Sequence, residues 1–134
     1  MVSCSITDVG CTVDNRVIPI WNTVAAIPGH IRDETVVLGC HRDAWVMGAV
    51  DPVSGTVSLH EIVRAFGVLL QNGWKPLRNV VIASWDAEEY GLIGSTEWAE
   101  DFPEWIQRNV VAYLNVDVSV SGSAWHASGS PSLP

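Results

Sequence analysis

Residues 79–98 of this 134-residue chain decide the fold, and they read Asn79-Val80-Val81-Ile82-Ala83-Ser84-Trp85-Asp86-Ala87-Glu88-Glu89-Tyr90-Gly91-Leu92-Ile93-Gly94-Ser95-Thr96-Glu97-Trp98. The run from Asn79 to Ala83 is short, apolar and β-branched, which is typical of a fully buried strand. Asp86, Glu88 and Glu89 follow directly. Like charges packed at the end of a buried strand cost free energy unless a cation or a proton relieves their repulsion. The stretch therefore favours a metal site; a solvated acidic turn, which its two glycines would suit, is the alternative.

Composition limits the class of protein. The length and the 48% hydrophobic content predict one domain with its own core. A net charge of -8 predicts no nucleic-acid partner and no contact with an anionic membrane surface. The apolar runs fall short of the roughly 20 residues that span a bilayer. Cys4, Cys11 and Cys40 are odd in number and not in metal-type pairs, so they support neither a disulfide framework nor a thiolate zinc site.

Hydrophobic spacing outlines the elements. Residues 17–27, interrupted by Pro19, predict a strand near a sheet edge, and residues 35–38 predict a second strand antiparallel to it. Apolar positions at three- and four-residue spacing predict an amphipathic helix over residues 55–72. Asp101 is predicted to cap a short helix, because Glu104 follows three residues later. The last apolar strand is expected at residues 110–115.

This alternation predicts an α/β fold with a mixed, mostly parallel sheet flanked by helices. Parallel strands present their carboxyl ends at one sheet edge, where open α/β sheets place their sites. His41, the acidic stretch 86–89 and Asp117 each follow a predicted strand, and Asp51 lies in the loop before the long helix. We therefore expect one imidazole and four carboxylates to meet at this edge.

Imidazole and carboxylates without thiolates suit catalytic zinc, manganese or cobalt better than structural zinc. Two divalent ions about 3.5–4 Å apart would need a bridging carboxylate and a water between them. Neighbouring side chains of an extended chain point in opposite directions, so Glu88 and Glu89 are expected to have different roles. One would bind metal and the other would take the proton of the water as general base.

Three segments, residues 39–45, 48–55 and 84–98, resemble glutamate carboxypeptidase II and its transferrin-receptor-like relatives, which are co-catalytic zinc peptidases. The resemblance extends from about Asn15 to Gly122. It implies a zinc-exopeptidase-like fold, a peptide substrate, and hydrolysis by a metal-bound water with a glutamate base. It leaves open whether amino- or carboxy-terminal residues are removed.

The resemblance also implies a role for each site residue. His41 and Asp117 would bind one Zn²⁺, Asp51 would bridge two ions, Glu89 would bind the second ion, and Glu88 would be the general base.

Three further residues match supporting positions of the family. Asp43 would steady the site by contacting a metal ligand. Glu97 and Glu100 match glutamates that hold a structural Ca²⁺ in the carboxypeptidases, although a solvated helix face is an equally open interpretation.

The family pattern is only partly present in this chain. Residues 15–122 would be a partial catalytic domain, after an N-terminal extension (residues 1–14) and before a Ser/Gly/Pro-rich, truncated end (residues 123–134). A second terminal histidine of the family lies beyond residue 134, so the second zinc site would be incomplete and the fragment alone inactive. No arginine stands at residues 125–128, where the family reads an acidic substrate side chain.

The parent protein is expected, from the resemblance, to be a membrane-anchored homodimer. Its catalytic domain would face the extracellular space or the vacuolar or endosomal lumen. The alternative function is a non-catalytic, transferrin-receptor-like binding or sorting module.

Overall fold

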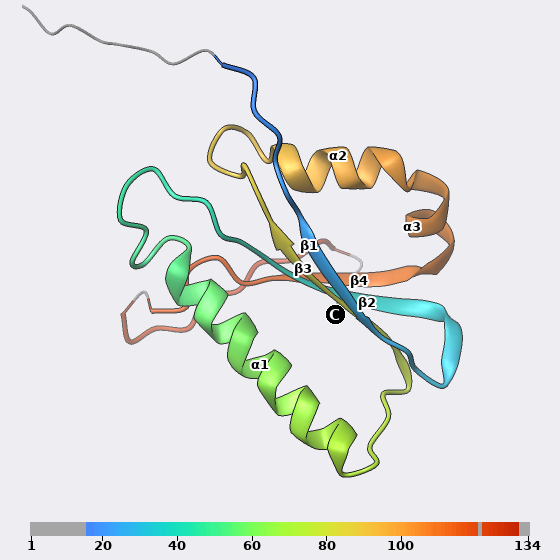
Figure 1. The fold of residues 1–134 in the computed structure, drawn as a ribbon. Coiled ribbons are helices and arrows are strands. Elements are labelled where there is room, and N and C mark those ends of the chain that lie inside the picture. The colour runs from blue at the N-terminus through green and yellow to red at the C-terminus, as the bar shows by residue number, and fades with distance from the viewer. Residues whose placement is uncertain (1–15, 121, 132–134) are drawn as a thin grey trace, which may run out of the picture.

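A computed structural model describes residues 16–120 and 122–131 of the chain. The elements follow the order β1 (Thr23–Ile27), β2 (Ile31–His41), α1 (Val53–Gln71), β3 (Arg78–Trp85), α2 (Ile93–Asp101), α3 (Pro103–Asn109) and β4 (Val110–Asn115). The strands form one sheet in the order β1-β3-β2-β4 (Figure 1). Cys4 and Cys11, and the extension formed by residues 1–14, lie outside the described residues.

The sheet is mixed and mostly parallel, as predicted. β2 pairs in parallel with both β3 and β4, and β1 pairs antiparallel with β3. β1 is an edge strand, as predicted, but it begins at Thr23 and not at residue 17, so Pro19 precedes the strand and does not determine its place at the edge. The carboxyl ends of β2, β3 and β4 therefore share one edge of the sheet.

The first two strands run in antiparallel directions, as predicted, but they do not pair with each other, because β3 lies between β1 and β2. The turn after β1 bonds to the start of β3 and not back to β1. The N–H of Gly29 donates to Asn79 Oδ1 at 2.9 Å, and the N–H groups of His30 and Ile31 donate to carbonyls of residues 76 and 77. A β-carbon at Gly29 would overlap the Arg78 backbone, so only glycine allows this crossing.

Helices cover both faces of the sheet (Figure 1). On one face Leu59 of α1 packs in a cluster with Cys40 and Ile82. On the other face a cluster of Val37, Val81, Ala83 and Trp85 packs against Trp98 of α2. The connection from β2 to β3 crosses the sheet in one direction, and the connection from β3 to β4 crosses it in the other. Two crossovers of the same hand that run in opposite directions place their helices on opposite faces of the sheet.

α1 is the amphipathic helix expected over residues 55–72, and it starts two residues earlier than predicted. Its length of 19 residues and mean hydropathy of 1.3 would also suit a membrane span, contrary to the expectation from apolar runs. Its buried residues, Gly55 and Leu59, face the protein, and Arg64 pairs with Glu61 on the helix at 2.7 Å. Only 11% of this apolar window is buried, and Val57, Val68 and Leu69 are exposed, so most of the surface of α1 is uncovered by the described residues. The absence of membrane contact stays a prediction.

The expected capping role of Asp101 is wrong. Asp101 is the last residue of α2, and α3 begins at Pro103 with Phe102 at the N-cap position. Proline is favoured at the first helical position because its fixed φ suits a helix start and it has no N–H to satisfy. Pro103 therefore sets the start of α3.

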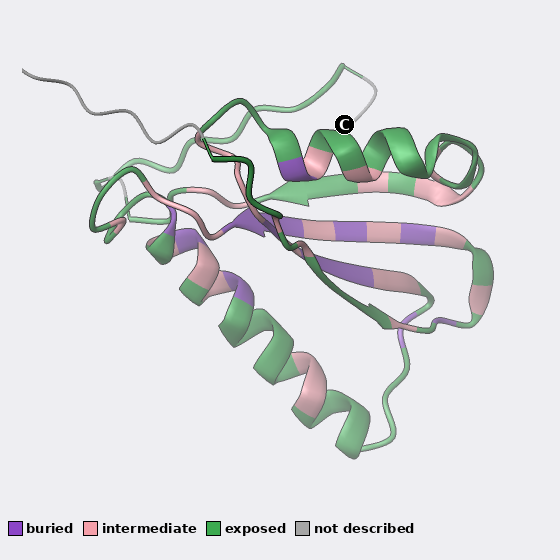
Figure 2. Ribbon diagram, turned by 45° about the horizontal axis from the view of Figure 1, so that its top comes forward, coloured by how far each residue is buried: buried purple, intermediate pink, exposed green. Residues whose placement is uncertain are grey.

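β4, the second edge strand, stays open to solvent. Val111, Tyr113 and Leu114 are 45–49% exposed, and Figure 2 shows the contrast with the buried central strands. An exposed apolar edge strand offers unpaired backbone groups and apolar surface to another chain segment.

Candidate metal centre and active site

His41 ends the central strand and is held on several sides. Its side chain is only 3% exposed. The N–H of Arg42 donates to the carbonyl of Trp85 on β3 at 3.1 Å, and the Thr56 hydroxyl of α1 donates to the His41 carbonyl at 2.8 Å. The imidazole is therefore fixed where β2, β3 and α1 meet.

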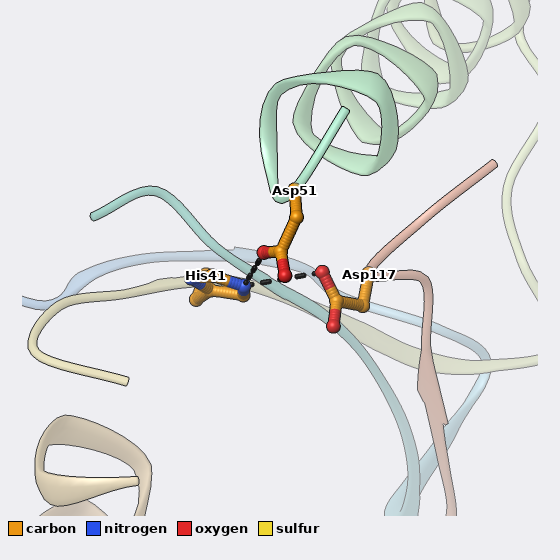
Figure 3. A group of neighbouring side chains, drawn as sticks. All are labelled: His41, Asp51 and Asp117. Carbon is orange, nitrogen blue, oxygen red and sulfur yellow. Dashed lines mark hydrogen bonds and ion pairs between the residues drawn. The ribbon is translucent and has the colours of Figure 1, made fainter. Parts of the chain in front are cut away.

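Two carboxylates converge on the Nε2 atom of His41 (Figure 3). Asp51 Oδ1 and Asp117 Oδ1 each lie 3.1 Å from it. Among the described residues, His41, Asp51 and Asp117 are the group of metal-type ligands whose donor atoms all lie within 4.8 Å of one another. The two carboxylates are half exposed, so an ion there would keep a position open to solvent, as catalytic sites with three protein ligands do.

A close contact between α1 and the loop after β4 brings these carboxylates together. A β-carbon at Gly55 would overlap the carbonyl oxygens of Val116 and Asp117. The Ser119 N–H donates to Ser54 Oγ at 3.1 Å, and the Ser119 hydroxyl donates to the Ser54 carbonyl at 2.8 Å. Glycine at position 55 therefore allows α1 to seat Asp51 beside Asp117.

The charge of the group fits a divalent cation. Glu88 Oε2 lies 3.7 Å from His41 Nε2, so three carboxylates face one imidazole nitrogen. Burial lowers the pKa of His41, but the carboxylates of Glu88, Asp117 and Asp43 outweigh it and raise the pKa overall. One imidazole proton cannot neutralise three carboxylates, whereas a divalent ion would relieve their repulsion.

Glu88 stands beside this group without being part of it. Burial raises its pKa, and the nearby carboxylates of Asp117, Glu89 and Asp43 raise it further against the opposing effect of His41. A carboxylate whose pKa is raised accepts a proton more readily near neutral pH, which is the property of a general base.

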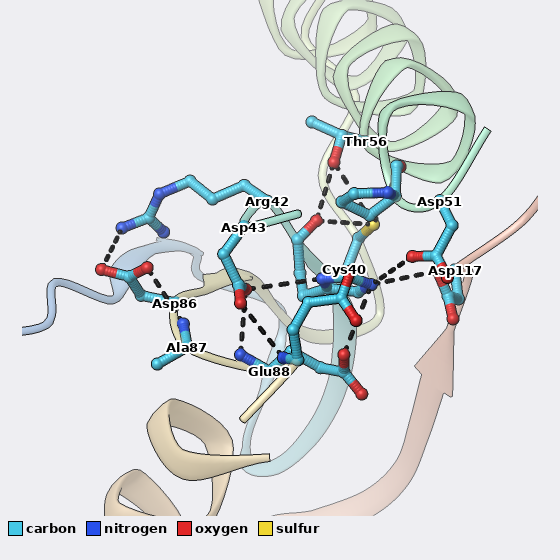
Figure 4. Close-up of polar contacts among 12 residues, drawn as sticks. Cys40, Arg42, Asp43, Asp51, Thr56, Asp86, Ala87, Glu88 and Asp117 are labelled. Atoms are coloured by element: carbon cyan, nitrogen blue, oxygen red, sulfur yellow. Dashed lines mark hydrogen bonds and ion pairs between the residues drawn. The ribbon is translucent and has the colours of Figure 1, made fainter. Parts of the chain in front are cut away.

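Asp43 ties the histidine to the acidic loop (Figure 4). Its Oδ1 accepts the N–H of Glu88 at 2.9 Å, and its Oδ2 accepts the N–H of Glu89 at 3.1 Å. Its Oδ1 also lies 3.4 Å from His41 Nδ1, within ion-pair distance but without hydrogen-bond geometry. Burial acts to raise the pKa of Asp43, yet the two backbone N–H donors lower it overall.

Other acidic residues lie outside the group. Glu89 Oε1 accepts the N–H of Trp45 at 3.3 Å, so its proposed role as a zinc ligand stays a prediction. Asp86 turns away and contacts Arg42 Nη2 at 3.4 Å. Glu97 and Glu100 are exposed on α2, and calcium binding there stays a prediction.

A cavity of about 230 Å³ adjoins the site. His41, Glu88 and Asp117 line one side of it, and the remaining lining includes Leu92, Ser95 and Tyr113. The Trp85 indole N–H donates to Tyr113 Oη at 2.9 Å. A substrate group could therefore sit next to the carboxylate of Glu88.

Sequence reasoning missed the residues that hold the site in place. Thr56 fixes the backbone of His41, and Asn22 bonds to both ends of the loop that carries Glu88. Their side-chain types are common and their partners lie far away in sequence, so no local pattern marks them. His126, also outside the metal group, lines a second cavity together with Asp117.

The chain is similar in sequence to known peptidases. The sequence profile of Peptidase family M28 matches residues 22–127. A "Probable glutamate carboxypeptidase" of Arthroderma benhamiae is 53% identical over 116 residues, which are 86% of this chain and 16% of that relative. "Aminopeptidase NAALADL1" of Mus musculus is 51% identical over 113 residues, which are 82% of this chain and 15% of that relative. The chain thus spans about a sixth of the length of these relatives.

Two crystal structures share the fold. A Peptidase M28 precursor from Shewanella amazonensis superimposes with a TM-score of 0.57 at 29% identity, over 68% of this chain and 21% of its own. LapA of Legionella superimposes with a TM-score of 0.60 at 30% identity, over 72% of this chain and 27% of its own.

Proposed function

Because the chain belongs to Peptidase family M28, we propose that it is part of a zinc exopeptidase that hydrolyses terminal peptide bonds. The observation that carries the proposal is the convergence of Asp51, Asp117 and Glu88 on His41 Nε2. The relatives carry the names of glutamate carboxypeptidases and of an aminopeptidase, so the proposal covers both ends of a peptide.

Two zinc ions are proposed to share the site. His41, Asp51 and Asp117 would hold one ion, and Asp51 and Glu89 would contribute to the other. Glu89 would first have to leave the Trp45 N–H. Bound zinc supplies Lewis-acid chemistry, which polarises the peptide carbonyl and lowers the pKa of water. Asp43 would keep the loop of Glu88 and Glu89 aligned with His41 through its bonds to both backbone N–H groups.

Glu88 is proposed as the general base. It lies next to the group at 3.7 Å from His41 Nε2 and on the wall of the 230 Å³ cavity, where it can reach both the metal group and a substrate. Its raised pKa supports the role, since the carboxylate would hold the proton taken from water and pass it to the leaving amine.

The domain organisation, assembly and location of the parent protein are proposed from the resemblance. We propose that residues 15–122 are part of a catalytic domain and that the parent is a membrane-anchored homodimer facing the extracellular space or a vacuolar or endosomal lumen. Substrate binding by the parent would need segments that continue beyond this piece.

The substitution Glu88→Gln in a full-length protein containing this segment tests the proposal. We expect zinc content to be unchanged and kcat to fall by roughly 10²–10⁴-fold, because the change removes a proton acceptor and not a metal ligand. Glu104→Gln, at an exposed position of α3, is the matched control and should leave kcat unchanged.

Near-normal turnover of Glu88→Gln would refute the role of Glu88. Fewer than one zinc per unsubstituted chain, together with no turnover, would instead favour the non-catalytic binding or sorting module.

A further inference from the structure

The loop that carries Glu88 has a backbone that is unfavourable on its own. We call residues 86–94, which join β3 to α2 and include the first two residues of α2, the Glu88 loop. Ala87 and Leu92 flank the two glutamates with φ angles of 53° and 60°. Left-handed backbone is disfavoured for residues with a β-carbon and persists where the surrounding structure holds it. The loop therefore needs contacts from outside itself.

One side chain supplies contacts at both ends of this loop. Asn22 lies in the extended segment before β1, separated from the loop by more than sixty residues of sequence. Its Oδ1 accepts the N–H of Asp86 at 3.1 Å, and its Nδ2 donates to the carbonyl of Gly94 at 2.7 Å. The amide of Asn22 thus bridges the first and last residues of the Glu88 loop.

The fit between Asn22 and the loop is close. A β-carbon at Gly94 would lie 2.5 Å from Asn22 Oδ1 and would overlap the carbonyl oxygen of Asp86. The N–H of neighbouring Trp21 donates to Asp86 Oδ2 at 2.7 Å, which fixes the same end of the loop a second time. Trp21 and Asn22, before β1, therefore hold the loop through their hydrogen bonds to Asp86 and Gly94.

Backbone hydrogen bonds inside the loop connect its ends to Glu88. The N–H of Gly94 donates to the carbonyl of Asp86 at 3.1 Å, and the N–H of Leu92 donates to the carbonyl of Glu88 at 2.7 Å. A shift at the closed ends is therefore passed on to the backbone of Glu88, whose carboxylate lies 3.7 Å from His41 Nε2.

We propose that Asn22 is a positioning residue for Glu88: it closes the Glu88 loop at Asp86 and Gly94 and so sets the carboxylate against the metal group. The inference rests on the proposed function, because it assigns Asn22 to the general base of that reaction. It adds a residue that directly precedes β1 and reaches the same sheet edge, because Thr23 pairs with Ser84 near the carboxyl end of β3.

The test compares Asn22→Ala with Asn79→Ala. Asn79 is a matched control because its side chain also accepts one backbone N–H, from Gly29 at 2.9 Å, and donates to one carbonyl, of Arg32 at 2.9 Å. Asn79 stands near the start of β3, at the opposite end of that strand from the Glu88 loop. Asn22→Ala removes two side-chain hydrogen bonds and Asn79→Ala removes three, because Asn79 Nδ2 also donates to Thr35 Oγ1 at 3.4 Å. Only Asn22→Ala removes hydrogen bonds from the Glu88 loop.

Hydrogen exchange of the 134-residue chain gives the first readout. In Asn22→Ala the N–H groups of Gly91, Leu92 and Gly94 should exchange about tenfold faster relative to those of β2, the factor that two ordinary hydrogen bonds can account for. In Asn79→Ala this ratio should stay at the wild-type value. Equal ratios in the two variants would overturn the inference, whatever the peptidase does.

Turnover of a full-length protein containing the segment gives the second readout. Asn22→Ala should lower kcat at least tenfold with KM and zinc content near wild type, while Asn79→Ala should keep the wild-type kcat. Faster loop exchange with an unchanged kcat would overturn the positioning role. Full activity of Glu88→Gln would overturn the proposed function, whereas the exchange result would still report whether Asn22 closes the loop.

Discussion

Gly55 lies directly against the backbone of Asp117, at a distance that leaves no room for a β-carbon. This contact joins the first turn of α1 to the loop after β4. Asp51 precedes that turn, so the separation of Asp51 and Asp117 depends on it. A methyl group at position 55 would push the two segments apart.

We therefore expect Gly55→Ala to weaken both zinc binding and the fold. Overpacking of this kind lowers the free energy of unfolding by about 1–3 kcal/mol. Gly67→Ala on the same helix is the control, since a β-carbon there meets nothing within 4 Å and should stabilise α1 by roughly 0.5–1 kcal/mol. Urea unfolding and calorimetric zinc titration measure the two effects. Equal zinc affinity in both variants would contradict the prediction.

Zinc titration of the unsubstituted 134-residue chain should detect no more than one weak site. The group consists of His41, Asp51 and Asp117, while Glu89 bonds to the Trp45 N–H, so a second ion would start with fewer than the usual three protein ligands. His41→Ala should abolish the site, and Glu104→Gln, at an exposed position of α3, should preserve it. Two tight sites together with peptidase turnover would rule this prediction out.

Asp43 should make the stability of the zinc-free chain depend on pH in the acidic range. Its pKa is lowered in the folded chain, since the Glu88 and Glu89 N–H donors outweigh burial. A carboxyl with a lowered folded-state pKa stabilises the fold above its unfolded pKa of about 3.9, and this contribution is lost as the pH falls through the folded-state value.

The substitution Asp43→Asn isolates that contribution. Near pH 6 it should lower the free energy of unfolding by about 2 kcal/mol, the size of a charged hydrogen bond, and the difference from wild type should shrink below pH 4. Chemical unfolding at a series of pH values checks it. A difference that stays constant from pH 6 to pH 2.5 would count against the assigned cause.

Local sequence patterns predicted the sheet edge that carries the site, because buried strands and the residues that follow them leave a clear signal. His41 is the last residue of β2 and Asp117 lies two residues after the end of β4, as expected. The loop residue Asp51 also lies within the group. These placements depend on hydrophobic periodicity and on the geometry common to parallel sheets.

Long-range contacts account for what the sequence did not predict. β3 lies between the first two strands, and the N–H of Gly29, in the turn after β1, donates to Asn79 on β3. The sequence near Gly29 does not indicate this partner, which lies fifty residues away. The side chain of Glu89 could turn in several directions, and the Trp45 N–H sets the one observed. Asn22 bonds to residues more than sixty positions away.

The strand order also governs how a nascent chain acquires its site. Proteins emerge from the ribosome with the N-terminus first. β2 pairs with β3 and β4, and both follow it in the sequence, so the central strand leaves the ribosome before either neighbour exists. His41 meets Asp117 only after β4 has emerged, so the proposed metal site is completed late in the synthesis of the chain.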